Sequence, residues 1–103
     1  MAYDMILTAM ADATRRSILE RLRSGPRNVA GLADGMPVSR PAISQHLKVL
    51  SDAGMLTISQ AGTSRIYALN PQGLNDLRRY LDELWDDAIN SYASYVEQEE
   101  KND

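Results

Sequence analysis

Apolar side chains recur every three or four positions in five stretches of this chain, the spacing that places them on one face of an α-helix. The pattern predicts helices over about residues 3–10, 13–23, 29–34, 40–52 and 71–96. Between the fourth and fifth stretches, "LTISQ" (56–60) and "RIYAL" (65–69) alternate apolar and polar residues instead. Such alternation is typical of β-strands, and the loop "AGTS" between them has the length of a hairpin connection.

Residues that favour helix ends stand where the pattern requires them. A good N-cap residue precedes each of the last four predicted helices: Asp12, Asn28, Ser39 and Asn70. The segment "GMPVS" at 35–39 makes a tight turn between the third and fourth helices. Two short helices joined by a glycine-containing turn, followed by a hairpin, predict a mainly α fold with a small β-hairpin wing. We therefore expect a winged helix-turn-helix with extra N- and C-terminal helices.

The fourth predicted helix, within "VSRPAISQHLKVLSDAGML", has one apolar and one polar face. At about 100° per residue, Leu47 and Leu50 lie within about 40° of Ile43 and form the face that we expect to be buried. The opposite face and its N-terminal flank present amide, hydroxyl and basic groups, which bond base edges and phosphates in the major groove of DNA. The candidate DNA-binding residues on this helix are Ser39, Arg40, Pro41, Ser44, Gln45, His46 and Lys48.

Several other polar residues fit two assignments. At the hairpin tip, Arg65 is expected to reach phosphates or a minor groove, whereas Thr63 and Ser64 fit either DNA contact or a solvated turn. His46, about 60° from the apolar stripe, is either a half-buried structural residue or a phosphate ligand. Five arginines around the second helix either pair with nearby acids or touch phosphate: Arg15, Arg16, Arg21, Arg23 and Arg27.

The net charge of −3 is distributed unevenly along the chain. Residues 1–70 carry eight Lys/Arg and five Asp/Glu, whereas residues 71–103 carry three and nine. A polyanion responds to charges within about 8 Å at physiological salt, so the acidic last third does not exclude a nucleic-acid partner. Double-stranded DNA is the expected partner.

The composition also argues against several classes of function. The chain has no cysteine and one histidine, which excludes disulfides, thiolate metal sites and cysteine nucleophiles. Paired acids such as Asp82 and Glu83 fit a solvated helix face better than acid–base catalysis, so we expect no enzyme, no cofactor and no metal. Without an apolar run of about 20 residues or a signal peptide, the expected setting is cytoplasmic, with no membrane segment.

The last predicted helix carries more apolar surface than a small winged domain can cover. A second copy related by a two-fold axis is the simplest partner, and it would place two recognition helices about 34 Å apart, one turn of DNA. The alternative is that the helix folds wholly against its own domain. The candidate homodimer-interface residues are Met5, Ile6, Ala9, Leu81, Leu84, Trp85, Ala88, Ile89 and Tyr92.

Three segments resemble the ArsR-type winged-helix transcriptional repressors: "ADATRRSILERL", "VSRPAISQHLKVLSDAGML" and "GTSRIYALNPQGLNDLRRYLDELW". The resemblance covers residues 3–96 and implies a homodimer built from the first and last helices. It also implies that the helix at 39–51 reads DNA and that the wing contacts the flanking backbone. Metal-sensing members use cysteine pairs in the third helix or His and acidic ligands in the last, and this chain has neither. It is therefore most similar to the branch without metal-binding cysteines, whose members often repress their own promoters.

These observations predict one domain over residues 1–98 and a polar tail at 99–103. The expected function is that of a sequence-specific, dimeric transcriptional regulator that represses by occupying a palindromic operator, for example in its own promoter. The alternative is a winged-helix module that binds another protein and not DNA. No effector ligand or partner protein is assigned from the sequence.

Overall fold

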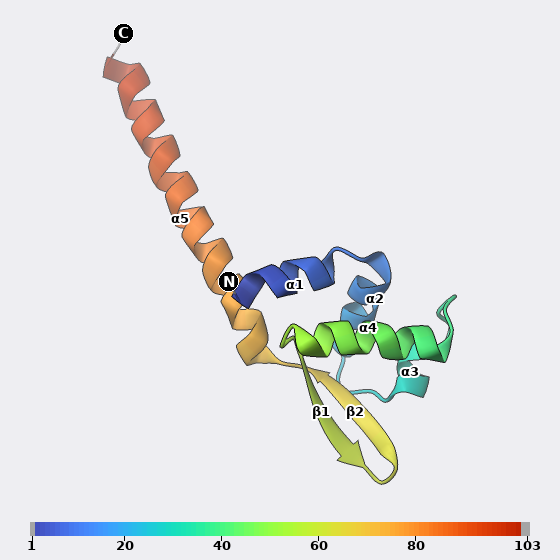
Figure 1. Ribbon diagram of the computed structural model, residues 1–103. Helices are drawn as coiled ribbons and strands as arrows, with labels where there is room; N and C mark the ends of the chain where they lie inside the picture. Colours follow the sequence, from blue (N-terminus) through green and yellow to red (C-terminus); the bar gives the residue numbers. More distant parts are fainter. Residues whose placement is uncertain (1, 102–103) are drawn as a thin grey trace.

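The computed structural model describes residues 2–101, with side chains from residue 3 onward. In chain order the elements are α1 (Ala2–Met10), α2 (Ala13–Leu22), α3 (Val29–Ala33), α4 (Arg40–Asp52), β1 (Leu56–Ala61), β2 (Ser64–Leu69) and α5 (Pro71–Lys101) (Figure 1). The predicted order of four helices, a hairpin and a long last helix is confirmed. The fold is a winged helix-turn-helix with an additional helix at each end.

All four predicted N-caps form. The bonds run from the backbone N–H of Arg15 to Asp12 Oδ2 (3.0 Å), of Gly31 to Asn28 Oδ1 (2.8 Å), of Ala42 to Ser39 Oγ (3.3 Å) and of Gln72 to Asn70 Oδ1 (3.2 Å). Each cap satisfies a backbone donor that has no partner within its helix and contributes about 1 kcal/mol. The caps explain why these helices begin where the sequence predicted.

The core lies where α1 to α4 meet the base of the hairpin. Ile43, Leu47 and Leu50 are fully buried, which confirms the apolar face predicted for α4. They form one cluster with buried residues from the other elements: Ile6, Ala9, Ile18, Leu22, Leu32, Met55, Leu56 and Tyr67.

Two residues that we assigned to a dimer interface belong to this core instead. Ile6 and Ala9 are 1% and 0% exposed within the single chain. The reason is the path of α1, which packs against α2, α4 and the start of α5 and so turns these two side chains inward. The sequence period identified the apolar face of α1 but not the surface that it covers.

The hairpin is slightly longer than predicted. Its strands pair from Leu56 opposite Leu69 to Ala61 opposite Ser64, which leaves a turn of two residues in place of the expected four-residue loop. Of the two turn residues, Gly62 has a positive φ of 62° and Thr63 does not, which is the pattern of a type II′ turn. At the other side of the hairpin, Tyr67 exchanges two backbone hydrogen bonds with Arg27, of 3.0 and 2.8 Å. These bonds hold the wing against the segment that precedes α3.

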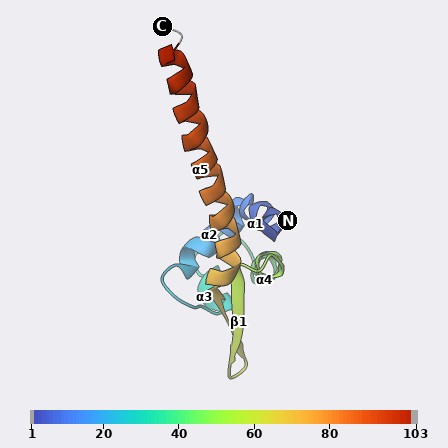
Figure 2. The ribbon, with the colours of Figure 1, turned by 90° about the vertical axis from the view of Figure 1, so that its left-hand side faces the viewer.

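Helix α5 projects from the domain as a single rod (Figures 1 and 2). Its 31 residues span about 46 Å, and no α5 residue among those described is buried. Only its base packs on the domain, through Leu74, Leu77 and a stack of Tyr80 on Tyr3 with ring centroids 4.3 Å apart. The radius of gyration is 19.0 Å, against about 13 Å for a compact chain of this length. Figure 2 shows the hairpin at the opposite end of the molecule from α5.

The last helix is longer than the predicted range of 71–96, because α5 continues to Lys101 and includes the described part of the predicted polar tail. Glu, Gln and Lys are strong helix formers, and the Tyr95 hydroxyl donates a hydrogen bond to Glu99 Oε1 at 2.8 Å, one turn ahead. Polarity alone therefore did not indicate a helix end. Residues 102 and 103 of the predicted tail lie outside the described residues.

Candidate nucleic-acid interface

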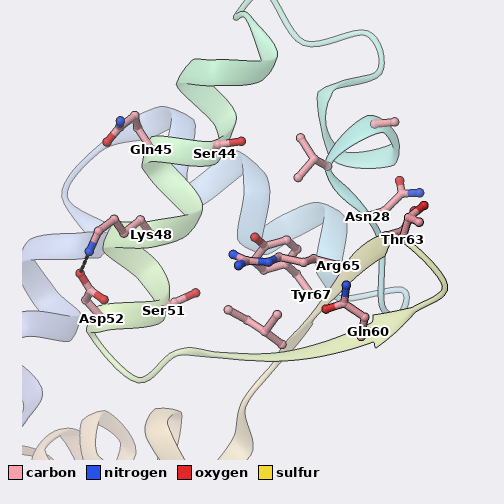
Figure 3. Close-up of a pocket in the computed structure, with 14 residues that line it drawn as sticks. Asn28, Ser44, Gln45, Lys48, Ser51, Asp52, Gln60, Thr63, Arg65 and Tyr67 are labelled. Atoms are coloured by element: carbon pink, nitrogen blue, oxygen red, sulfur yellow. Dashed lines mark hydrogen bonds and ion pairs between the residues drawn. The ribbon is translucent and has the colours of Figure 1, made fainter.

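A groove of about 800 Å³ separates the polar face of α4 from the hairpin, with the start of α3 at one side (Figure 3). Six of the ten DNA-binding residues predicted from the sequence line it: Ser44, Gln45, Lys48, Thr63, Ser64 and Arg65. The structure therefore brings the recognition helix and the wing tip to one surface. The two elements are held in this arrangement by the shared core beneath them, in which Leu47 of α4 and Tyr67 of β2 both lie.

The three remaining predicted residues at the start of α4 are exposed but lie outside this groove. Ser39 caps the helix, and Pro41 occupies its first turn, where the missing N–H costs no hydrogen bond. Arg40 is exposed beside them. An exposed helix N-terminus favours an anion even when one of its N–H groups is capped, and in DNA that anion is a phosphate.

The basic groups around the groove differ in how they are paired. Lys48 Nζ lies 2.9 Å from Asp52 Oδ2, one turn along α4, and both side chains are exposed. Such exposed pairs contribute less than about 1 kcal/mol, so a phosphate can compete with Asp52 for the lysine. Among the described residues, Arg40 and Arg65 form no hydrogen bond or ion pair through their side chains. These two guanidinium groups are the cations most available to a polyanion at this surface.

The groove also contains residues that were not predicted from the sequence. Gln60 lies opposite Arg65, and Ile58 lies opposite Tyr67, in the strand register. Directly paired residues share a face of a hairpin, as do residues two apart in one strand. The predicted strand pairing and the two-residue period would therefore have predicted that Gln60 and Tyr67 share a face with Arg65. Asn28 carried no such signal, because tertiary packing alone brings the start of α3 to the groove.

His46 lies against α2 and not in the groove. Its Nδ1 is 3.5 Å from Arg15 Nη1 and 3.9 Å from Asp12 Oδ2, and its side chain is 23% exposed. The pKa of the Asp12 carboxyl is lowered, chiefly because the carboxylate accepts the backbone N–H of Arg15, with help from the charges of Arg15 and His46. Of its two assignments, the structural one fits this position: His46 joins the recognition helix to the start of α2.

The arginines around the second helix are all engaged within the protein. The acceptors are the Thr8 and Ala9 carbonyls for Arg15, the Met10 carbonyl for Arg16, the Asp34 carbonyl for Arg21, Glu20 Oε2 for Arg23 and Ser24 Oγ for Arg27. We expected these arginines either to pair with nearby acids or to touch phosphate. Most of the acceptors are backbone carbonyls instead, and Arg15 and Arg16 bond those at the end of α1. The side chains of these arginines therefore stabilise the fold through hydrogen bonds within the protein.

A second exposed surface runs along α5. Six large apolar side chains of this helix are about half exposed or more: Leu81, Leu84, Trp85, Ile89, Tyr92 and Tyr95. Met5 of α1 is also exposed. The steps of three and four place the α5 side chains on one face, and the acidic residues of the helix lie mainly on the other. Seven of the nine predicted interface residues are thus exposed, the two exceptions being Ile6 and Ala9.

Residues 2–101 contain no group of three or more His, Cys, Asp or Glu side chains that is placed to hold a metal ion. None of the described helices combines the length and the apolar character that a bilayer span requires.

Comparison with known proteins identifies the family. Residues 10–58 match a family model described as a helix-turn-helix domain. The HTH-type transcriptional regulator Rv2034 of Mycobacterium tuberculosis is 50% identical over 96 residues, 93% of this chain and 90% of that protein. The transcriptional repressor SdpR of Bacillus subtilis is 34% identical over 69% of this chain and 79% of that protein. A solved ArsR-like transcriptional regulator from Rhodococcus sp. RHA1 has a TM-score of 0.79 and 28% identity, covering 90% of this chain and 88% of that one.

The fold and the groove define a winged helix-turn-helix protein that binds DNA and regulates transcription. More specifically, the chain belongs to the ArsR family of transcriptional repressors. The family and function expected from the sequence are confirmed at this level, and the family is one of regulators and not of enzymes.

Proposed function

We propose that this protein is a homodimeric repressor that blocks transcription by occupying a palindromic operator, for example in its own promoter. The observation that carries the proposal is the groove, in which Gln45, Ser44 and Arg65 converge from two elements on one open surface. Occupation of a promoter by such a dimer excludes RNA polymerase from the same DNA, so repression requires no catalytic group.

Each exposed group at this surface suits a particular part of the duplex. Gln45 bonds adenine through two hydrogen bonds, Arg40 bonds guanine, and Ser44 bonds either. Lys48 and the capped N-terminus of α4 bind phosphates, which fix the helix in the groove without reading sequence. Arg65 on the wing enters the adjacent minor groove or bonds its phosphate edge. The division predicts which substitutions change specificity and which change affinity alone.

The second copy of the chain covers the apolar face of α5. Six large side chains facing water are unusual for a monomer of this size, and burial of each half-exposed side chain returns on the order of 1 kcal/mol. A two-fold axis along this face buries the same residues of both protomers at once. Met5 and the α5 residues Leu81, Leu84, Trp85, Ala88, Ile89 and Tyr92 form this interface; Ile6 and Ala9 support it from the core.

We further place the protein in the branch of the family without metal-binding cysteines, since the chain contains no cysteine and one histidine. That histidine is already held between α2 and α4. Release from DNA therefore does not use thiolate–metal chemistry. Because the proposed operator lies in chromosomal DNA, we also propose that the protein acts in the cytoplasm.

The test is a fluorescence anisotropy titration of the purified protein against its own upstream region and against random duplex of equal length. We expect tight binding to one palindromic site and a steep loss of affinity with salt, because each neutralised phosphate releases counterions. Sedimentation equilibrium measures the oligomeric state. A monomer, or a protein that binds both duplexes equally, contradicts the proposal, and retention of another protein in place of DNA favours a protein-interaction module.

A further inference from the structure

The end of the recognition helix and the start of α5 are joined directly, although the whole hairpin separates them in the sequence. Figure 1 shows α5 starting beside the turn that follows α4. The turn consists of Ala53 and Gly54 and leads into Met55; Asn70 directly precedes α5, whose first turn runs from Pro71 to Gly73. This contact, named here the α4–α5 junction, connects the element that reads DNA to the element proposed to form the dimer.

Asn70 makes two hydrogen bonds across the junction. The Asn70 backbone N–H donates to the Met55 carbonyl at 2.8 Å, and the Asn70 side-chain Nδ2 donates to the Gly54 carbonyl at 3.1 Å. The remaining amide atom of the same side chain, Oδ1, accepts the N–H of Gln72 and caps α5. Asn70 therefore holds the first turn of α5 with one atom and the end of α4 with two others.

Gly73 brings the two backbones closer than any other residue type allows. A Cβ at position 73 would lie 1.7 Å from the Gly54 carbonyl oxygen and 2.6 Å from its carbon. Ordinary van der Waals contact begins near 3.4 Å. The obstructing atoms belong to the backbone, so no side-chain rotation can relieve the clash.

The turn that receives α5 is itself fixed by α4. Gly54 has a φ of 78°, and its N–H donates to the Ser51 carbonyl at 2.9 Å. The Met55 N–H donates to the Leu50 carbonyl at 3.1 Å. The glycine and these bonds form a helix C-cap of the left-handed type, so the Gly54 carbonyl has a set direction relative to the recognition helix. A continuous run of backbone bonds thus leads from α4 to the first turn of α5.

We infer that the α4–α5 junction sets the distance between the two DNA half-sites, with Asn70 and Gly73 as its positioning residues. The inference rests on the proposed dimer, in which α5 lies at the two-fold axis. Neither residue is proposed to touch DNA: each acts by holding α4 at a set position relative to that axis. The half-site distance of a symmetric operator then follows from the protein's own geometry.

The expected size of the effect comes from the Gly73 contact. An alanine at position 73 needs about 1.7 Å more room to move from 1.7 Å to ordinary contact. The displacement occurs in both protomers, so the distance between the recognition helices changes by up to about 3.4 Å. That distance is about the rise of one base pair along a strand. Gly73→Ala is therefore expected to change the preferred half-site separation by about one base pair.

The experiment first selects the duplex that the wild-type dimer prefers, then measures affinity by anisotropy for duplexes with the half-site separation changed by one or two base pairs in either direction. Gly73→Ala is expected to move the optimum by one base pair. Asn70→Asp keeps the helix cap but removes the donor to Gly54, and it is expected to flatten the profile to less than threefold between neighbouring separations. Gln72→Ala, in the same helical turn and exposed, is the matched control and is expected to keep the wild-type profile.

Circular dichroism and sedimentation equilibrium accompany each variant. If Gly73→Ala does not fold, Asn70→Asp decides the test. Folded, dimeric variants that keep the wild-type optimum and its steepness overturn this inference alone. A wild-type protein that is monomeric or indifferent to sequence overturns the proposed function, and the inference with it.

Discussion

Trp85 offers the sharpest test of the dimer, because it is the only tryptophan in the chain and lies on the apolar face of α5. Trp85 is 67% exposed in the single chain. We expect Trp85→Ala to weaken dimerisation strongly and to leave the fold of the domain unchanged. The fold is spared because Trp85 lies beyond the base of α5, where Leu74 and Leu77 make the contacts with the core.

The magnitude follows from the surface that Trp85 leaves uncovered. A tryptophan buries roughly 150–250 Å², so two thirds of it corresponds to about 130 Å². At about 25 cal/mol per Å², covering that surface contributes about 3 kcal/mol per protomer. A two-fold interface contains the residue twice, which gives an upper value of about 6 kcal/mol. The dimer dissociation constant should therefore rise between about 10²- and 10⁴-fold, at about 1.4 kcal/mol for each factor of ten.

Two measurements check this result. Sedimentation equilibrium gives the dissociation constants of the wild-type protein, Trp85→Ala and the conservative control Trp85→Phe, which should stay within about tenfold of the wild type. In the wild-type protein, dilution through the dissociation constant should shift the tryptophan emission to longer wavelength as the indole becomes exposed to water. Unchanged association of Trp85→Ala, together with emission that does not depend on concentration, would refute the assignment of this face to the interface.

Three further outcomes follow from the groove, the core and the caps. Gln45→Ala and Arg40→Ala should each cost about 1–3 kcal/mol of binding free energy on the preferred operator and relax base preference, whereas Lys48→Ala should weaken binding to all duplexes alike. Fluorescence anisotropy on specific and random DNA separates these effects, and equal losses for all three variants would contradict the assignment. Leu47→Ala, at a fully buried position, should lower the free energy of unfolding by about 2–5 kcal/mol in urea titrations, and a loss below 1 kcal/mol would contradict the described core. The lowered pKa of Asp12 adds stability that is present above the unfolded-state pKa of about 3.9 and is lost as the pH falls through the lower folded-state pKa. Asp12→Asn keeps a capping side chain but has no carboxylate to protonate, so its melting temperature should fall less than that of the wild type on acidification below about pH 4.

The recognition helix could be read largely from local sequence. Ser39, Pro41 and the buried stripe of Ile43, Leu47 and Leu50 determine where α4 begins and which face it turns inward, because capping and helical period act within a few residues. Once the buried stripe was assigned, the remaining residues of α4 defined its polar face. For the same reason, the hairpin was predicted to within two residues, and its error came from the turn, where Gly62 supports a shorter connection than the loop composition suggested.

Other features depended on contacts between distant segments. The burial of Ile6 and Ala9 was not predictable from the period of α1, since the period marks an apolar face but not the surface it meets. The same limit applies to His46, because its angle on α4 was known but its neighbours Arg15 and Asp12 lie in α2 and at the N-cap of α2. The end of α5 was missed for a different reason, because a polar segment of good helix formers has no signal that distinguishes a solvated helix from a frayed tail.

The sequence by itself determined the elements, the caps and the amphipathic faces, since these depend on interactions within about one or two turns of the chain. Only the tertiary structure decided which faces meet. It decided that the wing shares a groove with α4, that five arginines are used within the protein, and that Gly73 lies against the Gly54 backbone. The physical reason is that close packing between segments far apart in sequence depends on the shapes of both surfaces at once.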